Sequence, residues 1–350
     1  MKVRGVDLFC GVGGLTCGMR SAGIQVVAGY DIDRHSKFAY ETNNPGSTFN
    51  LKDVAEIASG ELRSLYPSDT DIRVLMGCAP CQPFSTYNRL PIDAPAKSSK
   101  MYLLEHFADH VMDLRPEIVS MENVPNLAQQ QVFKKFIDLL EQLGYHLNWG
   151  SVNTAIYGVP QSRKRLVLLA SRLGPISLPP ATHSLSDVVT VRDTIGHLAP
   201  LEAGQTHHID NLHRSRALSD INLQRIRASK PGGTWRDWPA TLLPNAYKKP
   251  SGKSYTSVYG RMQWDRLSPT ITTQFIGYGS GRFGHPEQDR ALSLREGALL
   301  QTFPEDYHFV PPEIGTNYHS QPVAIQIGNA VPPKLGQVLG HAIVSHTEEI

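Results

Sequence analysis

The stretch Val3-Arg4-Gly5-Val6-Asp7-Leu8-Phe9-Cys10-Gly11-Val12-Gly13-Gly14 decides the fold class. Its first half, residues 3–9, is predicted to be a buried strand, and the glycines that follow predict a tight turn. A short helical stretch then ends near Gly23. The order strand, turn, helix predicts the first unit of an α/β sheet.

Strands and helices continue to alternate through the first half of the chain. A second apolar strand at 25–30 runs into Asp31-Ile32-Asp33, and further strands are predicted at 72–76 and 118–121. Helices are predicted at 34–42, 102–114 and 132–143. This alternation predicts a mostly parallel sheet with helices on its faces.

The last two predicted strands, at 146–153 and 165–170, are separated by about a dozen residues that include Gly158-Val159-Pro160. A parallel connection needs a longer crossover, usually a helix. This last pair of strands is therefore predicted to be antiparallel.

The pattern changes after Ser171, where prolines and glycines punctuate the chain and little periodicity is sustained. We therefore expect a large first domain at 1–171 and a smaller, loop-rich domain at 172–295. Residues 296–350 are expected to return to the first domain, with a closing helix behind Pro332-Pro333.

Composition bounds the class of protein. The chain has 350 residues, of which 40% are hydrophobic and 19% charged, and this predicts a folded protein of two lobes. No apolar run approaches the roughly 20 residues that span a bilayer, and Asp7 interrupts any signal-peptide core, so we expect a cytoplasmic protein without a membrane partner. The four cysteines all lie in the first quarter of the chain, which favours reduced thiols over disulfides.

The net charge of +2 hides a strong asymmetry. Residues 205–295 carry 14 Lys/Arg and 6 Asp/Glu, whereas the rest of the chain carries 20 Lys/Arg and 26 Asp/Glu. Such a basic segment suits a surface that faces phosphates, because counterion release supplies much of the affinity for nucleic acids. A solvated, loop-rich region that is merely basic stays open as the alternative.

The glycine turn is a candidate cofactor site. Glycines between a strand and a helix let backbone N–H groups approach a cofactor, and an acidic residue at the end of the second strand can bind ribose hydroxyls. Gly11, Gly13, Gly14 and Asp31 fit this arrangement. The spacing Gly-Val-Gly-Gly differs from the Gly-x-Gly-x-x-Gly of dinucleotide sites, so a purely structural turn stays open.

Cys81 follows a predicted strand end, where open α/β sheets expose functional groups. A thiolate at this place is a candidate nucleophile. Cys78 and Cys81 also form a C-x-x-C, which could be a redox pair or half of a metal site, and either cysteine could be buried filler. The chain has no second cysteine pair to complete a zinc site, and we predict no metal.

Glu122 stands at the end of the next strand, in Ser120-Met121-Glu122-Asn123-Val124. The carboxyl ends of parallel strands meet at one edge, so Glu122 is predicted to share that edge with Cys81. A desolvated glutamate there could act as a general acid towards a ring nitrogen. A glutamate that only caps the following helix is the alternative.

An ordered set of motifs resembles that of the bacterial-type DNA cytosine-C5 methyltransferases. The motifs are DLFCGVGGL at 7–15, PCQPFS at 80–85, ENV at 122–124, GVPQSRKR at 158–165 and GNAVPP at 328–333. The resemblance spans the chain except about residues 172–265, the interval that holds the variable target-recognition region in this family. It implies a Rossmann-like, S-adenosylmethionine-dependent methyltransferase fold with a catalytic domain at 1–171 and a target-recognition domain at 172–295.

The resemblance also implies an activity, the methylation of C5 of a cytosine in a short, specific site of double-stranded DNA. The Cys81 thiolate would add to C6 while Glu122 stabilises protonation at N3, and Arg163 and Arg165 match the family's arginines near the active site. The target base would be flipped out of the duplex, because stacking covers its faces. Residues 85–100 are the candidate for a loop that closes over the flipped base.

S-adenosylmethionine would be the methyl donor, with S-adenosylhomocysteine as the product. The residues that match the family's cofactor contacts are Phe9, Gly11, Val12, Gly14, Asp31, Ile32, Asp53, Val54, Pro80, Asn329 and Val331. Cys78 stands where the family often has glycine, and we expect it to be a packing residue.

The basic interval is expected to contact DNA. Contacts to phosphates would position the duplex, and a subset at base edges would specify the sequence. The candidate DNA-binding residues are Ser85, Gln161, Lys248, Lys249, Arg261 and Thr270.

Two other functions stay open. An RNA cytosine-C5 methyltransferase, acting above all on tRNA, could use the same scaffold, and a DNA-binding module could retain the motifs after losing activity. The basic lobe favours DNA, and intact Cys81, Glu122, Arg163 and Arg165 favour an active enzyme. We expect a monomer on DNA, associated with the nucleoid, that is either an orphan methylase or the partner of a cognate restriction endonuclease.

Overall fold

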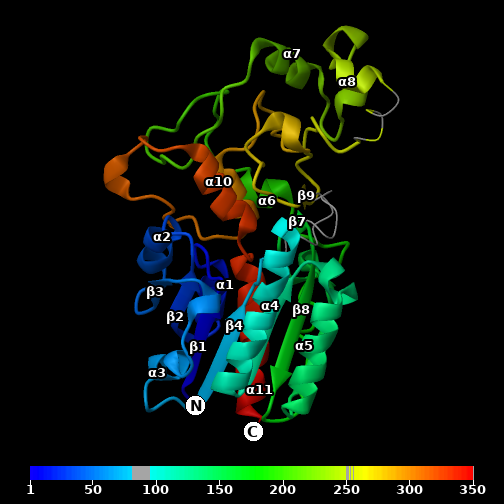
Figure 1. The fold of residues 1–350 in the computed structure, drawn as a ribbon. Coiled ribbons are helices and arrows are strands. Elements are labelled where there is room, and N and C mark those ends of the chain that lie inside the picture. The colour runs from blue at the N-terminus through cyan, green and yellow to red at the C-terminus, as the bar shows by residue number, and fades with distance from the viewer. Residues whose placement is uncertain (81–94, 250–251, 253, 255, 350) are drawn as a thin grey trace. The chain divides into compact units, whose positions relative to one another are not determined.

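The computed structural model describes residues 1–80, 95–249, 252, 254 and 256–349, with the backbone alone for 95–101 (Figure 1). The chain divides into two compact units. Unit 1 comprises Met1–Tyr157, Lys164–Thr182 and Ala330–Ile350, and unit 2 comprises Gly158–Arg163 and His183–Asn329. This division differs from the expected boundaries, because residues 172–182 belong to unit 1 whereas residues 158–163 and 296–329 belong to unit 2.

Unit 1 contains a seven-stranded sheet in the order β3-β2-β1-β4-β5-β8-β6. The strands are β1 (Val3–Leu8), β2 (Gln25–Asp31), β3 (Thr48–Leu51), β4 (Ile72–Gly77), β5 (Ile118–Asn123), β6 (His146–Asn153) and β8 (Lys164–Ser171). Strands β1 to β5 pair in parallel, and β8 is antiparallel to both β5 and β6. The α/β class, the mostly parallel sheet and the antiparallel last pair are confirmed.

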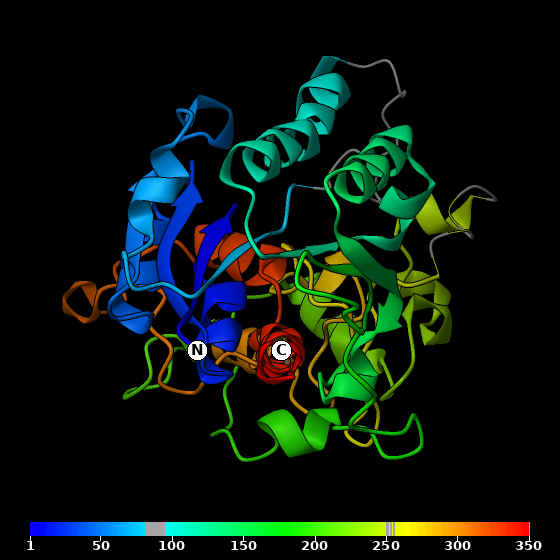
Figure 2. The same cartoon turned by 90° about the horizontal axis from the view of Figure 1, so that it is seen from below.

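Helices cover both faces of this sheet (Figure 2). One face carries α4 (Pro95–Leu114) and α5 (Gln131–Gln142), and the other carries α1 (Gly14–Ser21) and α11 (Pro333–Glu348). The helix α5 buries Val132, Phe133, Phe136 and Leu140, a spacing that puts all four on one side of a helix. The helix α4 begins at Pro95, earlier than the residue 102 that periodicity predicts.

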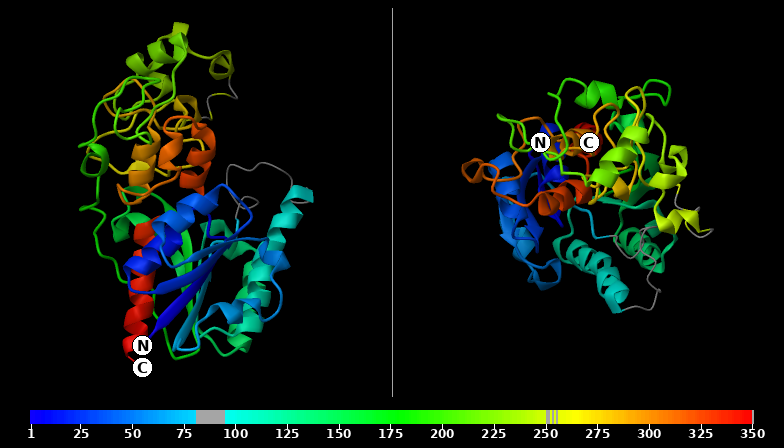
Figure 3. Two further views of the ribbon diagram at one scale, coloured as in Figure 1. Left: turned by 90° about the vertical axis from the view of Figure 1, so that its left-hand side faces the viewer. Right: turned by 90° about the horizontal axis from the view of Figure 1, so that it is seen from above.

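The helices α1 and α11 lie side by side, with both chain termini at the same end of unit 1 (Figure 3). A Cβ atom on Gly18 of α1 would collide with the backbone of Pro333 and Gly336. Glycine at this position therefore permits a helix contact that any larger residue would push apart. The described part of unit 1 also contains two shorter α-helices, α2 (Ser36–Asn43) and α3 (Glu61–Leu65), and a few short 3₁₀ helices.

Unit 2 is rich in loops, as expected. Its two-residue strands β7 (Gln161–Ser162) and β9 (Ser268–Pro269) pair in parallel. Its helices are α6 (Val191–Ile195), α7 (Asp220–Ala228), α8 (Asn245–Lys248), α9 (Leu294–Leu300) and α10 (Ser320–Asn329). An aromatic core around Trp235, Trp238 and Tyr278 supports unit 2.

No helix in the described ranges of the whole chain is long and apolar enough to cross a membrane.

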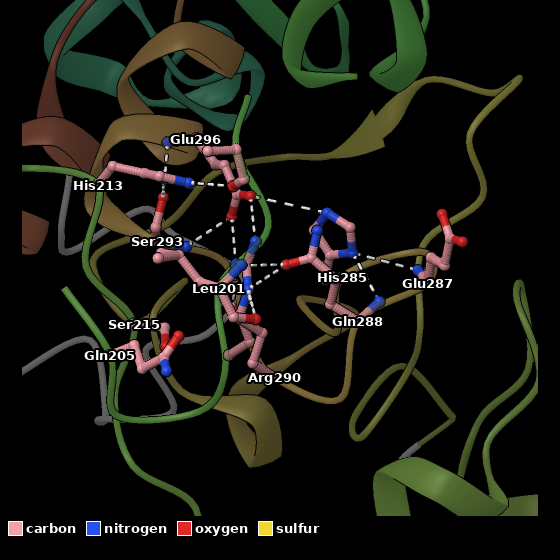
Figure 4. Close-up of polar contacts among 12 residues, drawn as sticks. Leu201, Gln205, His213, Ser215, His285, Glu287, Gln288, Arg290, Ser293 and Glu296 are labelled. Carbon is pink, nitrogen blue, oxygen red and sulfur yellow. Dashed lines mark hydrogen bonds and ion pairs between the residues drawn. The ribbon is translucent and has the colours of Figure 1, made fainter. Parts of the chain in front are cut away.

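A buried polar network holds the loops of unit 2 together (Figure 4). Arg290 donates to both carboxylate oxygens of Glu296, at 2.6 and 2.8 Å, and to the carbonyl oxygen of Leu201 at 3.2 Å. Glu296 also accepts from the backbone N–H of Ser293 and so caps α9. Burial lowers the pKa of His285, which packs beside this pair, to about 4. Polar contacts therefore supply the long-range order that short strands do not.

Candidate active site

The carboxyl ends of β1, β2, β4 and β5 meet at one edge of the sheet in unit 1. Because β8 runs in the opposite direction, its amino end lies at the same edge. Cys78 directly follows β4, Glu122 lies near the end of β5, and Arg165 lies at the start of β8. The sheet thus brings these three side chains to one place.

The glycine turn follows β1 and is tied to the end of β2. The backbone N–H of Gly11 donates to Oδ2 of Asp31 at 2.8 Å, and the N–H of Cys10 donates to the carbonyl oxygen of Tyr30. Gly13 begins α1 with a φ of 89°, a left-handed conformation that glycine adopts without strain. Phe9 has a φ of 64°, so the turn holds a residue that bears a side chain in the same region.

A buried chain of polar side chains lies beneath the turn. Oδ2 of Asp7 accepts from Thr16 at 2.7 Å, the hydroxyls of Thr16 and Tyr40 are 3.2 Å apart, and Tyr40 contacts Ser47 at 2.8 Å. Oδ1 of Asp7 has no hydrogen-bond partner within the described chain. Burial raises the pKa of Asp7 to about 7 against the opposing effect of the Thr16 hydrogen bond. The start of α1 is thereby fixed to β1 below the candidate cofactor site.

Acidic and apolar groups flank the turn. Asp31 keeps lone pairs on both oxygens beyond the hydrogen bonds from Gly11 and Asp33, and burial raises its pKa. Ile32 is 70% exposed, which is unusual for isoleucine, and Phe9 is half-buried. Asp53 uses Oδ1 to cap the 3₁₀ turn Val54–Glu56. A carboxylate that accepts hydrogen bonds, beside accessible apolar side chains, suits the ribose and the base of a nucleoside.

Glu122 is buried between a thiol and a guanidinium group. Its Oε2 accepts a hydrogen bond from Sγ of Cys78 at 2.9 Å, and its Oε1 lies 2.7 Å from Nε of Arg165. This second contact has the distance of an ion pair but not the alignment of a hydrogen bond, since Oε1 has no hydrogen-bond partner in the described chain. Glu122 is 2% exposed, so these two neighbours dominate its environment among the described residues.

Asn123 fixes the chain that leads away from β4. Its Nδ2 donates to the carbonyl oxygen of Ala79 at 2.9 Å, and its Oδ1 accepts from the N–H of Val124. Asn123 is itself 2% exposed. The segment Cys78-Ala79-Pro80 is therefore held against the end of β5.

Comparisons with known proteins agree with this arrangement. The sequence model of the C-5 cytosine-specific DNA methylase family matches residues 3–345. The chain belongs to this family. It is therefore a DNA cytosine-5 methyltransferase.

Relatives of the methyltransferase match it over nearly its whole length. The type II methylase M.HgiDII of Herpetosiphon aurantiacus is 49% identical over 97% of this chain and 94% of its own. The type II methyltransferase M1.HphI of Haemophilus parahaemolyticus is 31% identical over 98% of this chain and 87% of its own. The solved structure of the S. pombe Dnmt2 methyltransferase, 18% identical, covers 99% of this chain and 100% of its own with a TM-score of 0.62, which shows a shared fold.

The predicted cofactor-binding residues of the methyltransferase differ in how exposed their side chains are. Val12, Val54 and Val331, which were predicted to contact the cofactor, have buried side chains. Asn329 is exposed at the end of α10 in unit 2, and Pro80 is half-buried in unit 1. Cys81 and Ser85, as well as most of the expected loop at 85–100, lie outside the described residues.

The two arginines predicted near the active site, with Arg165 favoured as the contact, belong to different units. Arg165 lies in unit 1 beside Glu122, whereas Arg163 lies in unit 2. Arg163 is 3% exposed and donates to the carbonyl oxygen of Ile271 at 3.3 Å. Its described contact therefore supports the strand pair β7–β9.

The polar side chains of Gln161 and Arg261 do not fit the expectation that they contact DNA. Gln161 is fully buried and bonds to the backbone of Leu300 and Ile271. Arg261 is 6% exposed and donates to the carboxylate of Asp289 at 2.7 Å. Thr270, also expected to contact DNA, is half-buried and donates to the carbonyl oxygen of Ser162 at 2.7 Å. Internal hydrogen bonds and ion pairs therefore hold Gln161, Thr270 and the two terminal nitrogens of Arg261.

Lys248 and Lys249 are exposed at the end of α8. The preceding residue, Tyr247, stacks its ring on Trp235 with centroids 4.8 Å apart, which anchors the lysine pair to the aromatic core. The exposed cations of the basic interval within the described chain are Arg216, Arg227, Lys230, Arg236, Lys248, Lys249, Arg266 and Arg282. The basic surplus of the sequence is thus present on the surface of unit 2.

Sequence reasoning missed Cys78 and Asn123. Cys78 was expected to pack, yet it donates to the predicted general acid. The sequence signal that could have drawn attention to Cys78 is a side chain, three residues before Cys81, at a position where the family often has glycine. Asn123 follows Glu122 in the same motif, but only its contact with Ala79 shows what it holds.

Proposed function

We propose that this methyltransferase transfers a methyl group from S-adenosylmethionine to C5 of a cytosine within a short, specific duplex DNA site, as the modification enzyme of a type II restriction–modification system. The observation that carries this proposal is the buried Glu122 carboxylate between Cys78 and Arg165, at the sheet edge where Cys81 follows in the sequence. The type II methylases among its relatives support the biological setting.

Cys81 forms a bond from its sulfur to C6 of the flipped cytosine, and the electrons of the C5–C6 double bond move towards N3. Glu122 donates a proton to N3, so that C5 becomes an enamine carbon. Arg165 keeps the Glu122 carboxylate compensated when it is ionised. After methylation C5 loses its hydrogen as a proton to solvent, and the sulfur leaves C6 by β-elimination as the thiolate. N3 returns its proton to Glu122, which restores the neutral aromatic base and the acid.

The residues at the glycine turn fit S-adenosylmethionine. Phe9 and Ile32 offer apolar surface for adenine, and the Asp31 carboxylate offers acceptors for the ribose hydroxyls. Among the described residues nothing lies within 4 Å of a Cβ placed on Gly11, which leaves room for the methionine part. Asp53 and Val54 resemble the family's adenine-contacting motif. The cofactor supplies an electrophilic methyl group, and the chain needs only to position it.

Bisulfite sequencing of DNA from cells that express the chain tests both activity and sequence specificity. We expect one short motif in which a cytosine is protected from conversion. DNA with 5-fluorocytosine in that motif should trap a covalent adduct with the purified wild-type protein, because elimination needs a hydrogen on C5. Equal trapping by Cys81→Ala would contradict the role of Cys81, and labelled methyl transfer to tRNA instead of duplex DNA would contradict the substrate.

A further inference from the structure

We propose that Cys78 is a positioning residue of the methyl-transfer reaction, whose thiol orients the Glu122 carboxylate for proton exchange with the cytosine ring. The inference rests on the role of Glu122 in the proposed function. It concerns Cys78, for which the sequence predicts only a packing role.

The contact is specific to one oxygen. Sγ of Cys78 is 2.9 Å from Oε2 of Glu122, while Arg165 approaches Oε1 without hydrogen-bond alignment. Within the described part of the chain, Cys78 is therefore the side chain that donates a hydrogen bond to this carboxylate. An ion pair alone tolerates rotation of the carboxylate plane, whereas a hydrogen bond to one oxygen opposes it.

The backbone positions Cys78 beside Glu122. Gly77 of β4 pairs with Met121 of β5, so the next residue of each strand, Cys78 and Glu122, lies at the same level of the sheet. A Cβ on Gly77 would press on the carbonyl oxygen of Leu8, and Asn123 holds Ala79 on the other side of Cys78. The thiol is thus fixed between two restrained neighbours and packs against the apolar cluster of α1 and α11.

A thiol suits the task that the proposed mechanism sets. Glu122 has to hold a proton at one stage and release it to N3 at another, so a partner that can only donate would favour the ionised form alone. A thiol is a weak donor and a weak acceptor, and it can stay in contact with both forms of the carboxyl group. Orientation is then maintained through the proton transfer.

A double-mutant cycle with Glu122 tests the inference. We expect Cys78→Ala to lower kcat about tenfold, the effect of losing one hydrogen bond to a charged group. The KM for DNA and the Kd for S-adenosylmethionine should stay within twofold, because neither ligand is bound by Cys78. Cys78→Ser, which restores a donor, should recover most of the lost kcat.

The cycle also separates positioning from a structural role. In the Glu122→Gln background, Cys78→Ala should lower the residual single-turnover rate no further, because the group it acts through has changed. Cys17→Ala, in α1, is the matched control and should leave kcat unchanged. Cofactor binding and Tm confirm that each variant is folded, and Cys78→Val, near in size but without a donor, replaces the alanine variant if that one does not fold.

Three results would overturn the inference. A wild-type kcat for both Cys78→Ala and Cys78→Val, with Glu122→Gln strongly impaired, would remove the role of Cys78 and leave that of Glu122 intact. An equal loss of kcat from Cys78→Ala in both backgrounds would show that the thiol acts independently of Glu122. A wild-type kcat for Glu122→Gln would instead overturn the proposed role of Glu122 and the inference with it.

Discussion

Arg290 and Glu296 form an ion pair 2.6 Å long whose side chains are 0% and 1% exposed. The pair joins the loop before α9 to the first turn of that helix, and Arg290 extends the contact to Leu201, 89 positions earlier in the chain. The paired strands β7 and β9 of unit 2 contain only two residues each. The Arg290–Glu296 ion pair therefore supplies long-range contacts that a longer sheet would otherwise provide.

Glu296→Gln should strongly destabilise unit 2. The substitution leaves a buried guanidinium group without its counter-charge, and breaking such a pair costs about 3–5 kcal/mol. The measurement is the free energy of unfolding from urea titration, followed by tryptophan fluorescence. Glu305→Gln, at an exposed position, is the control and should change stability by less than about 0.5 kcal/mol. A similar small change for Glu296→Gln would contradict the assigned role of the pair.

Stability should fall as the solution becomes acidic, in a window set by His285. Burial lowers the pKa of His285 in the folded protein to about 4, below the value of about 6.5 for an exposed histidine. As the pH falls from 6.5 to 4, His285 is protonated in the unfolded chain but stays neutral in the folded one. The free energy of unfolding therefore drops over this range by up to about 3 kcal/mol.

Urea titrations at pH 7.5, 5.5 and 4.5 measure this effect. His285→Gln should flatten the decline relative to the wild type, whatever the substitution does to stability at pH 7.5. His341→Gln, at an exposed site of α11, should keep the wild-type pH dependence. Parallel pH curves for wild type and His285→Gln would show that His285 is not responsible.

Asp7 should produce a pH dependence of the opposite sign. Burial raises its pKa in the folded protein to about 7, above the unfolded value of about 3.8. The folded chain keeps a proton that the unfolded chain loses, so this contribution to stability declines as the pH rises from about 4 to 7 and is constant above that range.

Asp7→Asn removes this titration. Relative to the wild type, the variant should gain a few kcal/mol of unfolding free energy between pH 4.5 and pH 8, because the amide never has to ionise in the core. Asp71→Asn, at an exposed site, supplies the control curve. A constant difference between Asp7→Asn and wild type over this range would refute the raised pKa.

Lys248 and Lys249 should contribute affinity for DNA without contributing sequence specificity. If both contact phosphates, replacing the pair by alanine should reduce the slope of log K against log salt by about two and weaken binding to all duplexes alike. Fluorescence anisotropy over a salt series measures both quantities. The pair Lys134 and Lys135, exposed on α5, is the matched control and should leave the slope unchanged. A selective loss for the methylation site alone would assign these lysines to base readout instead.

Pattern reasoning predicted six of the seven sheet strands, and most of these contain buried apolar residues that mark them in the sequence. It missed β3, a four-residue edge strand with only Phe49 buried, since so short and half-exposed a segment resembles a loop. The motifs predicted the family and the residues at the sheet edge. The motifs could not show that Gln161 and Arg261 are buried. A polar residue in a sequence motif can bind a ligand or form hydrogen bonds within the protein, and the sequence does not distinguish the two.

The sequence by itself determined the family, the order of strands and helices along the first half of the chain, and the candidate roles of Cys81, Glu122 and Asp31, because each depends on local pattern or on motif spacing. Only the tertiary structure decided that Cys78 contacts Glu122, and that Arg165 and not Arg163 is its described ionic neighbour. These relationships depend on the register of β4 and β5 and on the reversed direction of β8. The direction of the last strand pair already followed from its short connection, whereas register is set by long-range packing, which no local pattern of residues encodes.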